Sequence, residues 1–407
     1  MGRSNDRVGC AIVATPSSTR SGADRCPGLL APFVASDGAM VRLRIPGGRV
    51  DVGLLAAVSA LAGRFGVADI TLTSRGSLQL RGLPDPLPRE LITAIDDLRL
   101  VPSGPHDKAR NIVADPHAGL DPLVTALDEG LLGDPGLAEL PGRFLLAVTS
   151  PGGPVLAEPW DVAIVASPRS DVASRHPRGP SGPAARTSAT VHVVADGRAV
   201  TVPRDEAAET ALDVARSFLA ARPDTRTWNL RDLPEAARAD LLPGSLPFDV
   251  VAGDPPAPGP VGADLVALVP LGLLTPAMVE GLRGSAADGI APQPEGSGQR
   301  LAVTPWRSIV VPGAAARAEE LATAGFVTAP DSPWTVLTAC AGAPACARTT
   351  TPTRDLARAA APLIDPAGSP VHVIGCERAC GHPARPHTIA LNPRTAADVV
   401  AAQLEKA

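Results

Sequence analysis

Four of the six cysteines lie in two pairs near the C-terminal end of the chain, in "CAGAPAC" (340–346) and "CERAC" (376–380). Thiolates bind soft metal ions and iron–sulfur clusters. Zinc sites usually pair cysteines across two to four residues, so the wide C-x5-C half disfavours a zinc knuckle. Two inert buried pairs are a further alternative. We expect one [4Fe–4S] cluster, bound by Cys340, Cys346, Cys376 and Cys380.

Regular structure is predicted beside both pairs. The apolar run "VHVIG" directly precedes the second pair and predicts a strand, and "PTRDLARAAAPLI" follows the first pair and predicts a helix. Loops between a strand and a helix offer backbone N–H groups and the positive end of the helix dipole. Both stabilise anionic thiolates and cluster sulfides.

The composition excludes several classes of function. The net charge of −5 gives no sign of a nucleic-acid surface, and no apolar run is long enough to cross a bilayer. Val8–Ala14 is too short for a secretory signal, so we expect a flexible tail at 1–20 and a cytoplasmic protein. In a reducing compartment, clustered cysteines usually bind metal or carry out redox chemistry. Only Lys108 and Lys406 are lysines, so lysine chemistry has few candidates.

Two segments resemble each other, at 40–82 and 264–313. In each, a strand, a turn, an amphipathic helix and a second strand are predicted from apolar periodicity. Each second strand carries a threonine followed by an arginine, Thr73 with Arg75 and Thr304 with Arg307. The pattern predicts an internal duplication.

The duplication suggests an order of regions along the chain, because each copy is followed by a different segment. A Pro-rich stretch at 252–262 predicts a stiff linker into the second copy. We expect a tail at 1–20, a first half domain at 21–90, an α/β domain at 91–245 with a disordered insert near 167–189, a second half domain at 246–325, and a cluster-binding α/β domain at 326–407.

The cysteine spacing is similar to the cluster signature of the sirohaem-dependent sulfite and nitrite reductase superfamily. The segments "LTSRGSLQLRG", "ARNIVADPHAGLDP" and "LPGRF" resemble that family's active-site motifs, and the resemblance extends from residue 24 to the end. It implies an α+β fold with pseudo-two-fold symmetry. Two ferredoxin-like half domains and two α/β domains would surround a central tetrapyrrole cleft.

Within the superfamily, three motifs most resemble the precorrin-3B synthase branch: "RCPGLL", "TPWRSIVVPG" and "GCERACGHP". That resemblance implies an O2-dependent monooxygenase of aerobic cobalamin biosynthesis. It would hydroxylate precorrin-3A at C20 and form a γ-lactone. No Gly-rich dinucleotide fingerprint follows a predicted strand, so we expect an external electron donor such as a ferredoxin or an NAD(P)H-dependent reductase.

One departure from the reductase pattern bears on the chemistry. The reductases carry lysines in an "LPRKFK"-like segment, where they help to supply protons to the bound oxyanion. Here the segment reads "LPGRFL", with Arg143 at one basic position and Leu145 at the other. Arginine keeps its proton, so it binds anions but is a poor acid. This favours a relative that binds another substrate.

Arginines also suit a tetrapyrrole, because precorrins and sirohaem both carry carboxylates around the ring. A guanidinium pairs with a carboxylate through two parallel hydrogen bonds. We expect Arg75 and Arg110 to face the cysteine loops across one cleft. The full set of candidate substrate-binding residues is Arg75, Arg81, Arg110, Asn111, Arg143 and Arg307.

Several roles remain open. In the reductases the last cysteine bridges the cluster to sirohaem iron, and a metal-free precorrin would leave Cys380 as a cluster ligand only. Cys26 is a ligand, a pocket residue or, as we expect, an ordinary core thiol. A mononuclear non-haem iron has histidine candidates without a recognisable triad, so we assign none: His106, His117, His372, His382 and His387. The alternative functions are a sirohaem sulfite or nitrite reductase and a non-catalytic metal-binding protein, with zinc as one candidate metal.

Overall fold

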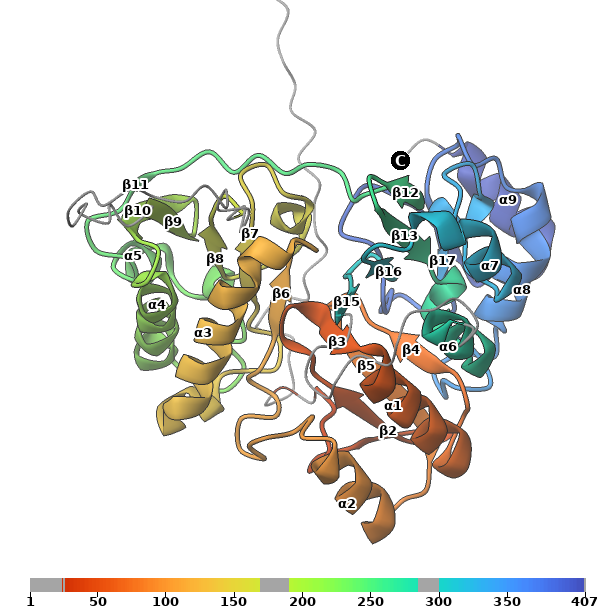
Figure 1. Cartoon of the computed structure of the whole chain (residues 1–407), viewed down its shortest axis with the longest axis horizontal. Coiled ribbons are helices and arrows are strands. Elements are labelled where there is room, and N and C mark those ends of the chain that lie inside the picture. Colours follow the sequence, from red (N-terminus) through yellow and green to blue (C-terminus); the bar gives the residue numbers. More distant parts are fainter. Residues whose placement is uncertain (1–23, 25, 169–189, 285–299, 406–407) are drawn as a thin grey trace, which may run out of the picture.

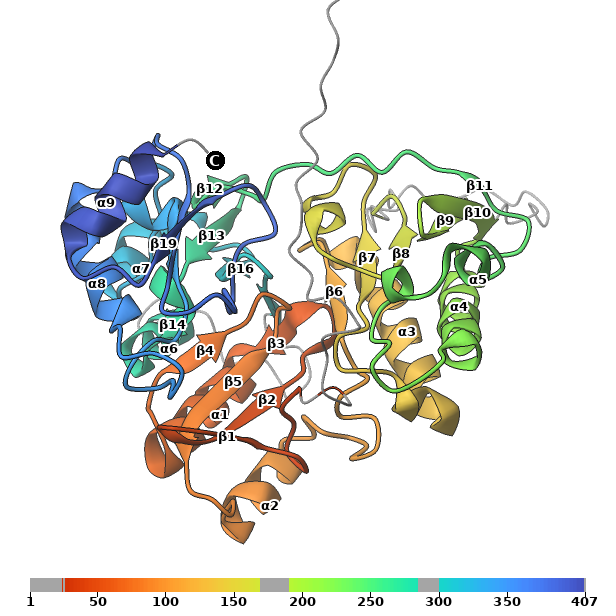
Figure 2. The same cartoon turned by 180° about the vertical axis from the view of Figure 1, so that it is seen from behind.

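The computed structural model describes Asp24 and residues 26–168, 190–284 and 300–405. The expected tail and nearly all of the expected insert lie outside these residues. In Figures 1 and 2, two sheet-and-helix units lie on opposite sides of a pair of smaller half domains. The described residues form two five-stranded sheets, one six-stranded sheet and one three-stranded sheet. The predicted α+β fold is confirmed, while the domain boundaries stay predictions.

The first half domain is a five-stranded antiparallel sheet in the order β1-β2-β5-β4-β14. Helix α1 begins at Val52 because the Asp51 side chain accepts a hydrogen bond from Leu54 N, which is an N-cap interaction. Figure 2 looks onto the opposite face of this sheet, with α1 behind the strands. The elements are β1 (Phe33–Ala35), β2 (Gly38–Leu43), β3 (Arg49–Asp51), α1 (Val52–Phe65), β4 (Ile70–Leu72), β5 (Leu78–Leu83) and α2 (Arg89–Asp97).

The second half domain repeats this plan, in the order β12-β13-β16-β15-β3. The repeated order confirms the predicted duplication at the level of the fold. The elements are β12 (Gly259–Val261), β13 (Asp264–Leu268), β14 (Leu273–Leu274), α6 (Pro276–Arg283), β15 (Arg300–Val303), β16 (Ser308–Val311) and α7 (Ala318–Thr323).

Each half domain lends one short strand to the other sheet. Strand β3 pairs antiparallel with β15, and β14 pairs antiparallel with β4. The crossing of β3 requires glycine at position 48, where φ is +69° and an added Cβ would overlap Val303 O. The two halves therefore share backbone hydrogen bonds and cannot be separated without breaking both sheets.

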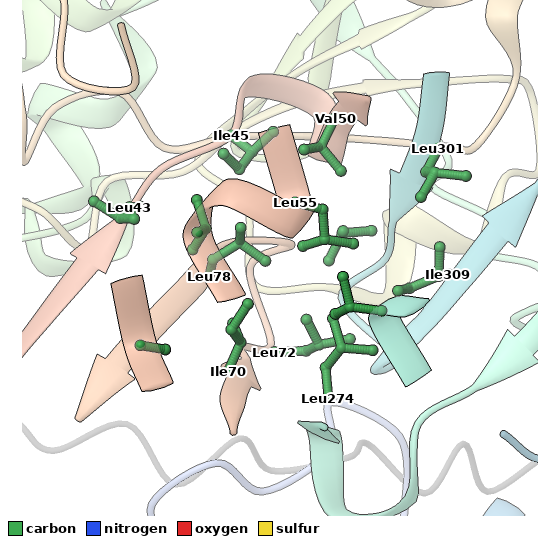
Figure 3. Close-up of a cluster of buried hydrophobic side chains, with 14 of the residues drawn as sticks. Leu43, Ile45, Val50, Leu55, Ile70, Leu72, Leu78, Leu274, Leu301 and Ile309 are labelled. Carbon is green, nitrogen blue, oxygen red and sulfur yellow. The ribbon is translucent and has the colours of Figure 1, made fainter. Parts of the chain in front are cut away.

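The two half domains also share one hydrophobic core, which Figure 3 shows in close-up. Leu55 of α1 lies there between Leu72 of the first sheet and Ile309 of the second. All three side chains are fully buried or nearly so. Burial of this shared apolar surface stabilises the arrangement in which the two sheets lie side by side.

The turns before β5 and β16 have the same hydrogen bonds. In the first, Thr73 N donates to Ser77 O and Thr73 Oγ1 accepts from Ser77 N. In the second, Thr304 N donates to Ser308 O and Thr304 Oγ1 accepts from Ser308 N. Thr73 and Thr304 are therefore structural equivalents.

The equivalence extends to the residues between each threonine and serine. Gly76 and Arg307 share the left-handed position of the turn, at φ +61° and +60°. Trp306, one residue earlier, is the equivalent of Arg75. Arg75 and Arg307 each follow the threonine of their strand but occupy different positions of the two turns.

The first α/β unit contains the six-stranded sheet, in the order β11-β10-β9-β8-β7-β6. Strands β6, β7 and β8 are parallel, and α3 and α4 pack together beside them. The elements are β6 (Ile112–Ala114), α3 (Asp121–Gly133), β7 (Leu146–Thr149), β8 (Val162–Val165), β9 (Thr190–Ala195), β10 (Arg198–Pro203), α4 (Ala207–Ala221), α5 (Glu235–Ala239) and β11 (Leu246–Pro247).

The second α/β unit is a parallel three-stranded sheet in the order β17-β18-β19. Helices α8 and α9 contribute Ala357 and Val399 to the core on one face. None of the helices in the described residues has the length and apolar character needed to cross a membrane. The elements are β17 (Leu337–Ala339), α8 (Thr353–Ala360), β18 (Val371–Ile374), β19 (Thr388–Leu391) and α9 (Ala396–Leu404).

Candidate functional site

Both cysteine pairs start at the same edge of the three-stranded sheet. Cys340 directly follows β17, and Cys376 follows β18 after one glycine. The strands are parallel and adjacent, with Ala339 opposite Val373, so their carboxyl ends lie together. Cys340 N donates to Val373 O at 2.9 Å, which fixes the start of the first loop against the second strand.

The four thiols lie close enough to influence one another electrostatically. The pKa of Cys380 is raised, mainly by burial and then by Cys340, Cys376 and Cys346, while Arg378 opposes the rise. Cys380 keeps some exposed surface, yet the surrounding atoms still desolvate its sulfur. The structure thus gathers the predicted ligands in one neighbourhood.

The donor set fits a cluster better than a single ion. Among the described residues, no group of three or more His, Cys, Asp or Glu side chains is arranged to hold one metal ion. A cluster holds its thiolates around a larger body, so its ligands stand further apart than those of one zinc ion. Four thiolates in two loops are the usual donors of a [4Fe–4S] cluster.

The first cysteine loop rests on the first half domain. Arg81 forms a bidentate ion pair with Asp37, with both distances 3.0 Å, and also donates to Ala345 O at 2.8 Å. Ser36 Oγ donates to Pro344 O at 2.9 Å. Arg81, expected to bind substrate, instead anchors the loop that carries Cys340 and Cys346.

We expect Arg81→Met to weaken retention of the cluster. A hydrogen bond from a charged donor contributes about 1.5 kcal/mol, so losing the bond to Ala345 predicts roughly tenfold faster release of iron to a chelator. The unpaired Asp37 should also lower the free energy of unfolding by about 3 kcal/mol. Iron release and thermal unfolding measure the two effects.

Arg283→Met is the matched control, because Arg283 pairs with Glu280 on the surface, where both side chains are more than half exposed. Iron release from Arg81→Met at the wild-type rate would contradict the anchoring role.

The second cysteine loop is held from two directions. Arg307 donates to Gly381 O at 2.6 Å. His372 lies under the loop, fully buried, with Nε2 at 3.2 Å from Cys380 O and Nδ1 at 2.8 Å from Thr338 Oγ1. A carbonyl oxygen only accepts, so Nε2 carries the proton and Nδ1 accepts from the threonine. Burial holds the pKa of His372 well below its usual value, which keeps the ring neutral.

A group of arginines lies on the helix-free face of the first sheet. Arg42 lies in β2 and Arg44 directly follows its last residue, Leu43, and both share a neighbourhood with Arg75, Arg143 and Cys26. Burial is the main cause that lowers the pKa values of Arg42, Arg44 and Arg75. The neighbouring arginines lower them further, while Cys26 and the nearby carboxylates of Asp24, Asp107 and Asp161 act in the opposite sense.

Two buried guanidinium atoms in this group have no hydrogen-bond partner among the described residues, Arg42 Nε and Arg44 NH2. Arg44 is 2% exposed and is held by Asn111 Oδ1, Pro27 O and Asp107. Unpaired buried donors are costly and usually mark a missing anionic partner. The alternating arginines of "MVRLRIPGG" were a readable signal, but we did not predict Arg42 or Arg44 as site residues.

Arg75 and Arg143 belong to the same region. Arg75 donates to Gly142 O at 2.8 Å and to Arg143 O at 3.1 Å, so it pins the "LPGRF" segment. The Arg143 side chain is 53% exposed, 3.8 Å from Asp24 and stacked over Trp228. Cys26 Sγ donates to Gly142 O at 3.3 Å, beside these arginines.

The structure corrects the role predicted for Arg110. Its guanidinium forms a bidentate ion pair with Asp128 of α3 at 2.8 Å and donates to Leu100 O at 3.0 Å. It ties two segments of the first α/β unit together and is only 7% exposed. The expectation that it faces the cysteine loops was wrong, because Asp128 satisfies its charge. The neighbouring Asn111 donates to Lys108 O and Gly142 O and so positions Arg44.

The candidate histidines divide into two sets. His106 is buried between Ser103 Oγ and Asp134 O, and His117 precedes a short 3₁₀ helix in the first α/β unit. The other three rings lie near the second cysteine loop. The ring of His387 contacts those of His372 and His382. The iron site itself stays without an assigned ligand set.

More positive charge lies beside the cysteines. The pKa of Arg307 is lowered to about 10 by burial and by Arg354, and each of these arginines has one buried nitrogen without a partner in the described residues. The pKa of Arg354 is likewise lowered, first by burial, with Cys340 acting in the opposite sense. Arg354 thus lies close enough to Cys340 for the two groups to interact electrostatically.

Comparisons with known proteins agree with this geometry. Residues 34–88 match the nitrite/sulfite reductase ferredoxin-like half domain. The solved structure of Mycobacterium tuberculosis NirA protein superposes with a TM-score of 0.56 over 84% of this chain and 69% of that chain, at 18% identity. The fold is that of NirA. This observation confirms the two half domains and their flanking α/β units.

A curated relative, precorrin-3B synthase of Sinorhizobium sp, is 36% identical over 108 residues. The match covers 26% of this chain and 22% of the relative, so it spans about a quarter of each protein. The suspected resemblance to this group of proteins is confirmed over that region. A match of this length does not show that this chain has the activity of the whole relative, so that activity is a proposal for this chain.

Proposed function

We propose that this protein is a precorrin-3B synthase-like monooxygenase that hydroxylates precorrin-3A at C20 with γ-lactone formation. The observation that supports it most is the arrangement of charge between the two halves. The first half domain presents a group of arginines in which two buried nitrogens, Arg42 Nε and Arg44 NH2, have no partner among the described residues, and the second half carries the cysteine loops that rest on the first. A ring that bears several carboxylates beside a redox cluster matches both features.

Different residues of this chain would hold the cluster, bind the substrate and fix the cysteine loops. The four cysteines would hold a [4Fe–4S] cluster, which when bound supplies electrons one at a time from an external donor. Arg42 and Arg75 would bind ring carboxylates and fix the orientation of the macrocycle. Arg81 and Arg307 would hold the two cysteine loops in place.

Leu145 favours this reading over reduction of a small oxyanion. It is 1% exposed, packs in the core of the first α/β unit, and donates its N–H to Asp161. No side chain from that position can deliver a proton to the cleft. Binding a carboxylate requires only fixed positive charge, which the arginines provide.

The test is complementation of a cobalamin-auxotrophic strain that lacks its own precorrin-3B synthase. We expect growth to be restored, and the purified protein to consume O2 with precorrin-3A and a reductant. Absence of growth together with rapid reduction of sulfite or nitrite would move the assignment to the reductases.

A sirohaem-dependent sulfite or nitrite reductase is the second candidate. Four clustered guanidinium groups can also bind a small oxyanion, and the fold is shared with NirA. Optical and EPR spectra of anaerobically purified protein separate the two. A sirohaem band would favour the reductase, and cluster signals alone would favour the monooxygenase.

A further inference from the structure

A single carboxylate links the two halves of the chain beside the candidate site. Glu158 follows a short 3₁₀ helix, Pro154–Ala157, in the first α/β unit. Its Oε1 accepts a hydrogen bond from Trp306 Nε1 at 3.0 Å. Trp306 occupies the turn before β16 and is the structural equivalent of Arg75.

Glu158 lies where four parts of the molecule meet. Arg75, from the turn before β5, and Arg385, from the loop after the second cysteine pair, both act on its charge. Trp306 packs with Trp160 against the buried Leu145 and Val155. The carboxyl is therefore held by one tryptophan N–H and lies within electrostatic reach of two arginines.

Both protonation states of Glu158 are accessible near neutral pH. Burial raises the pKa of its carboxyl to about 7, while the hydrogen bond from Trp306 and the charges of Arg75 and Arg385 pull it down. Within the described part of the chain, Oε2 accepts no hydrogen bond. One oxygen is thus held in place, and the other is available to a further partner.

The proposed reaction consumes protons. Hydroxylation takes the substrate C–H, O2, two electrons from the external donor and two protons, and yields the alcohol and water. Arginines do not release protons at neutral pH, and Leu145 cannot. His372 already donates its one N–H to Cys380 O. A proton donor must come from another side chain, and carboxylic acids near their pKa are efficient donors.

We propose that Glu158 is the proton donor of this site, passing its proton to the oxygen atom that is reduced and regaining one from solvent. The proposal rests on the proposed function, but reduction of nitrite or sulfite also consumes protons and would use the same donor. The bond to Trp306 holds the carboxyl in position during transfer.

Glu158→Gln tests the proposal, because the amide oxygen still accepts from Trp306 but the side chain cannot donate an acidic proton. We expect turnover to fall about 100-fold or more, with KM for the tetrapyrrole unchanged. Wild-type turnover should fall as pH rises through about 7, since the protonated form is the donor. This limb of the pH profile should be absent in Glu158→Gln.

Trp306→Phe is the companion variant. It removes the hydrogen bond that stabilises the carboxylate, so the pKa of Glu158 should rise and the falling limb should move to higher pH. A purely structural role would lower activity equally at every pH and leave the limb in place.

A readout without turnover completes the experiment. Infrared difference spectra of the protein across neutral pH should show one protonated carboxyl band that titrates in wild type and is missing in Glu158→Gln. Absence of that band, or wild-type turnover and pH profile in Glu158→Gln, would overturn the proposal. If wild type reduces nitrite or sulfite but does not use O2, the proposed function fails, and the effect of Glu158→Gln on that reduction decides this inference separately.

Discussion

Cys376→Ser is expected to remove most of the iron and sulfide from the protein. Cys376 follows β18 after one glycine, where its pair meets the pair after β17 at one edge of the sheet. A serine hydroxyl stays protonated at neutral pH and is a poor ligand for iron, so three thiolates must hold the cluster alone. Iron and sulfide analysis of anaerobically purified protein measures the loss.

Cys26→Ser is the matched control, since Cys26 lies among arginines of the first half domain and donates to Gly142 O. We expect this variant to keep its full content of iron and sulfide. A complete cluster in Cys376→Ser would refute the ligand assignment. Zinc without sulfide in the wild-type protein would refute the cluster itself.

The features predicted well from sequence depend on short stretches of chain. Cysteine spacing, apolar alternation in "LTSRGSLQLRG" and the repeated strand–helix–strand pattern are each contained in one segment. The fold class and the duplication follow from them. The strand before the second cysteine pair was also predicted, but the strand before the first pair, and the parallel pairing of the two, are known only from the structure.

The features predicted poorly depend on partners far away in the chain. Arg110 reads as a site residue until Asp128, one helix later, is seen to neutralise it. Arg81 reads as a substrate ligand until Ala345, 264 residues away, is seen to accept its hydrogen bond. In an Arg-rich chain, the sequence cannot say which cations are already paired.

The exchange of β3 and β14 between the sheets was also beyond prediction. These strands contain three and two residues, too few for a readable period. Their pairing depends on how the two halves pack, which is set by the shared core.

Arg42→Met is expected to weaken binding of a carboxylated tetrapyrrole and to stabilise the protein that lacks it. The Arg42 side chain is partly buried, and its buried Nε has no partner among the described residues, beside Arg44 and Arg143. If it binds a desolvated carboxylate, truncation should cost about 2–5 kcal/mol, a loss of roughly 30-fold to several thousandfold in affinity. Without ligand, removing an uncompensated buried charge should raise the free energy of unfolding by about 1 kcal/mol.

Replacing a binding residue and replacing a structural residue should change the stability of the ligand-free protein in opposite directions. A residue kept for packing or internal pairing would lower that stability when replaced. Spectroscopic titration with a carboxylated porphyrin measures the affinity, and thermal unfolding without ligand measures the stability. Arg64→Met is the control, since Arg64 and Glu90 form an exposed pair, each 61% accessible, and should change neither quantity. Unchanged affinity in Arg42→Met, or a loss of stability without ligand, would contradict the role of Arg42. The cation-rich face of the first sheet would then need another explanation.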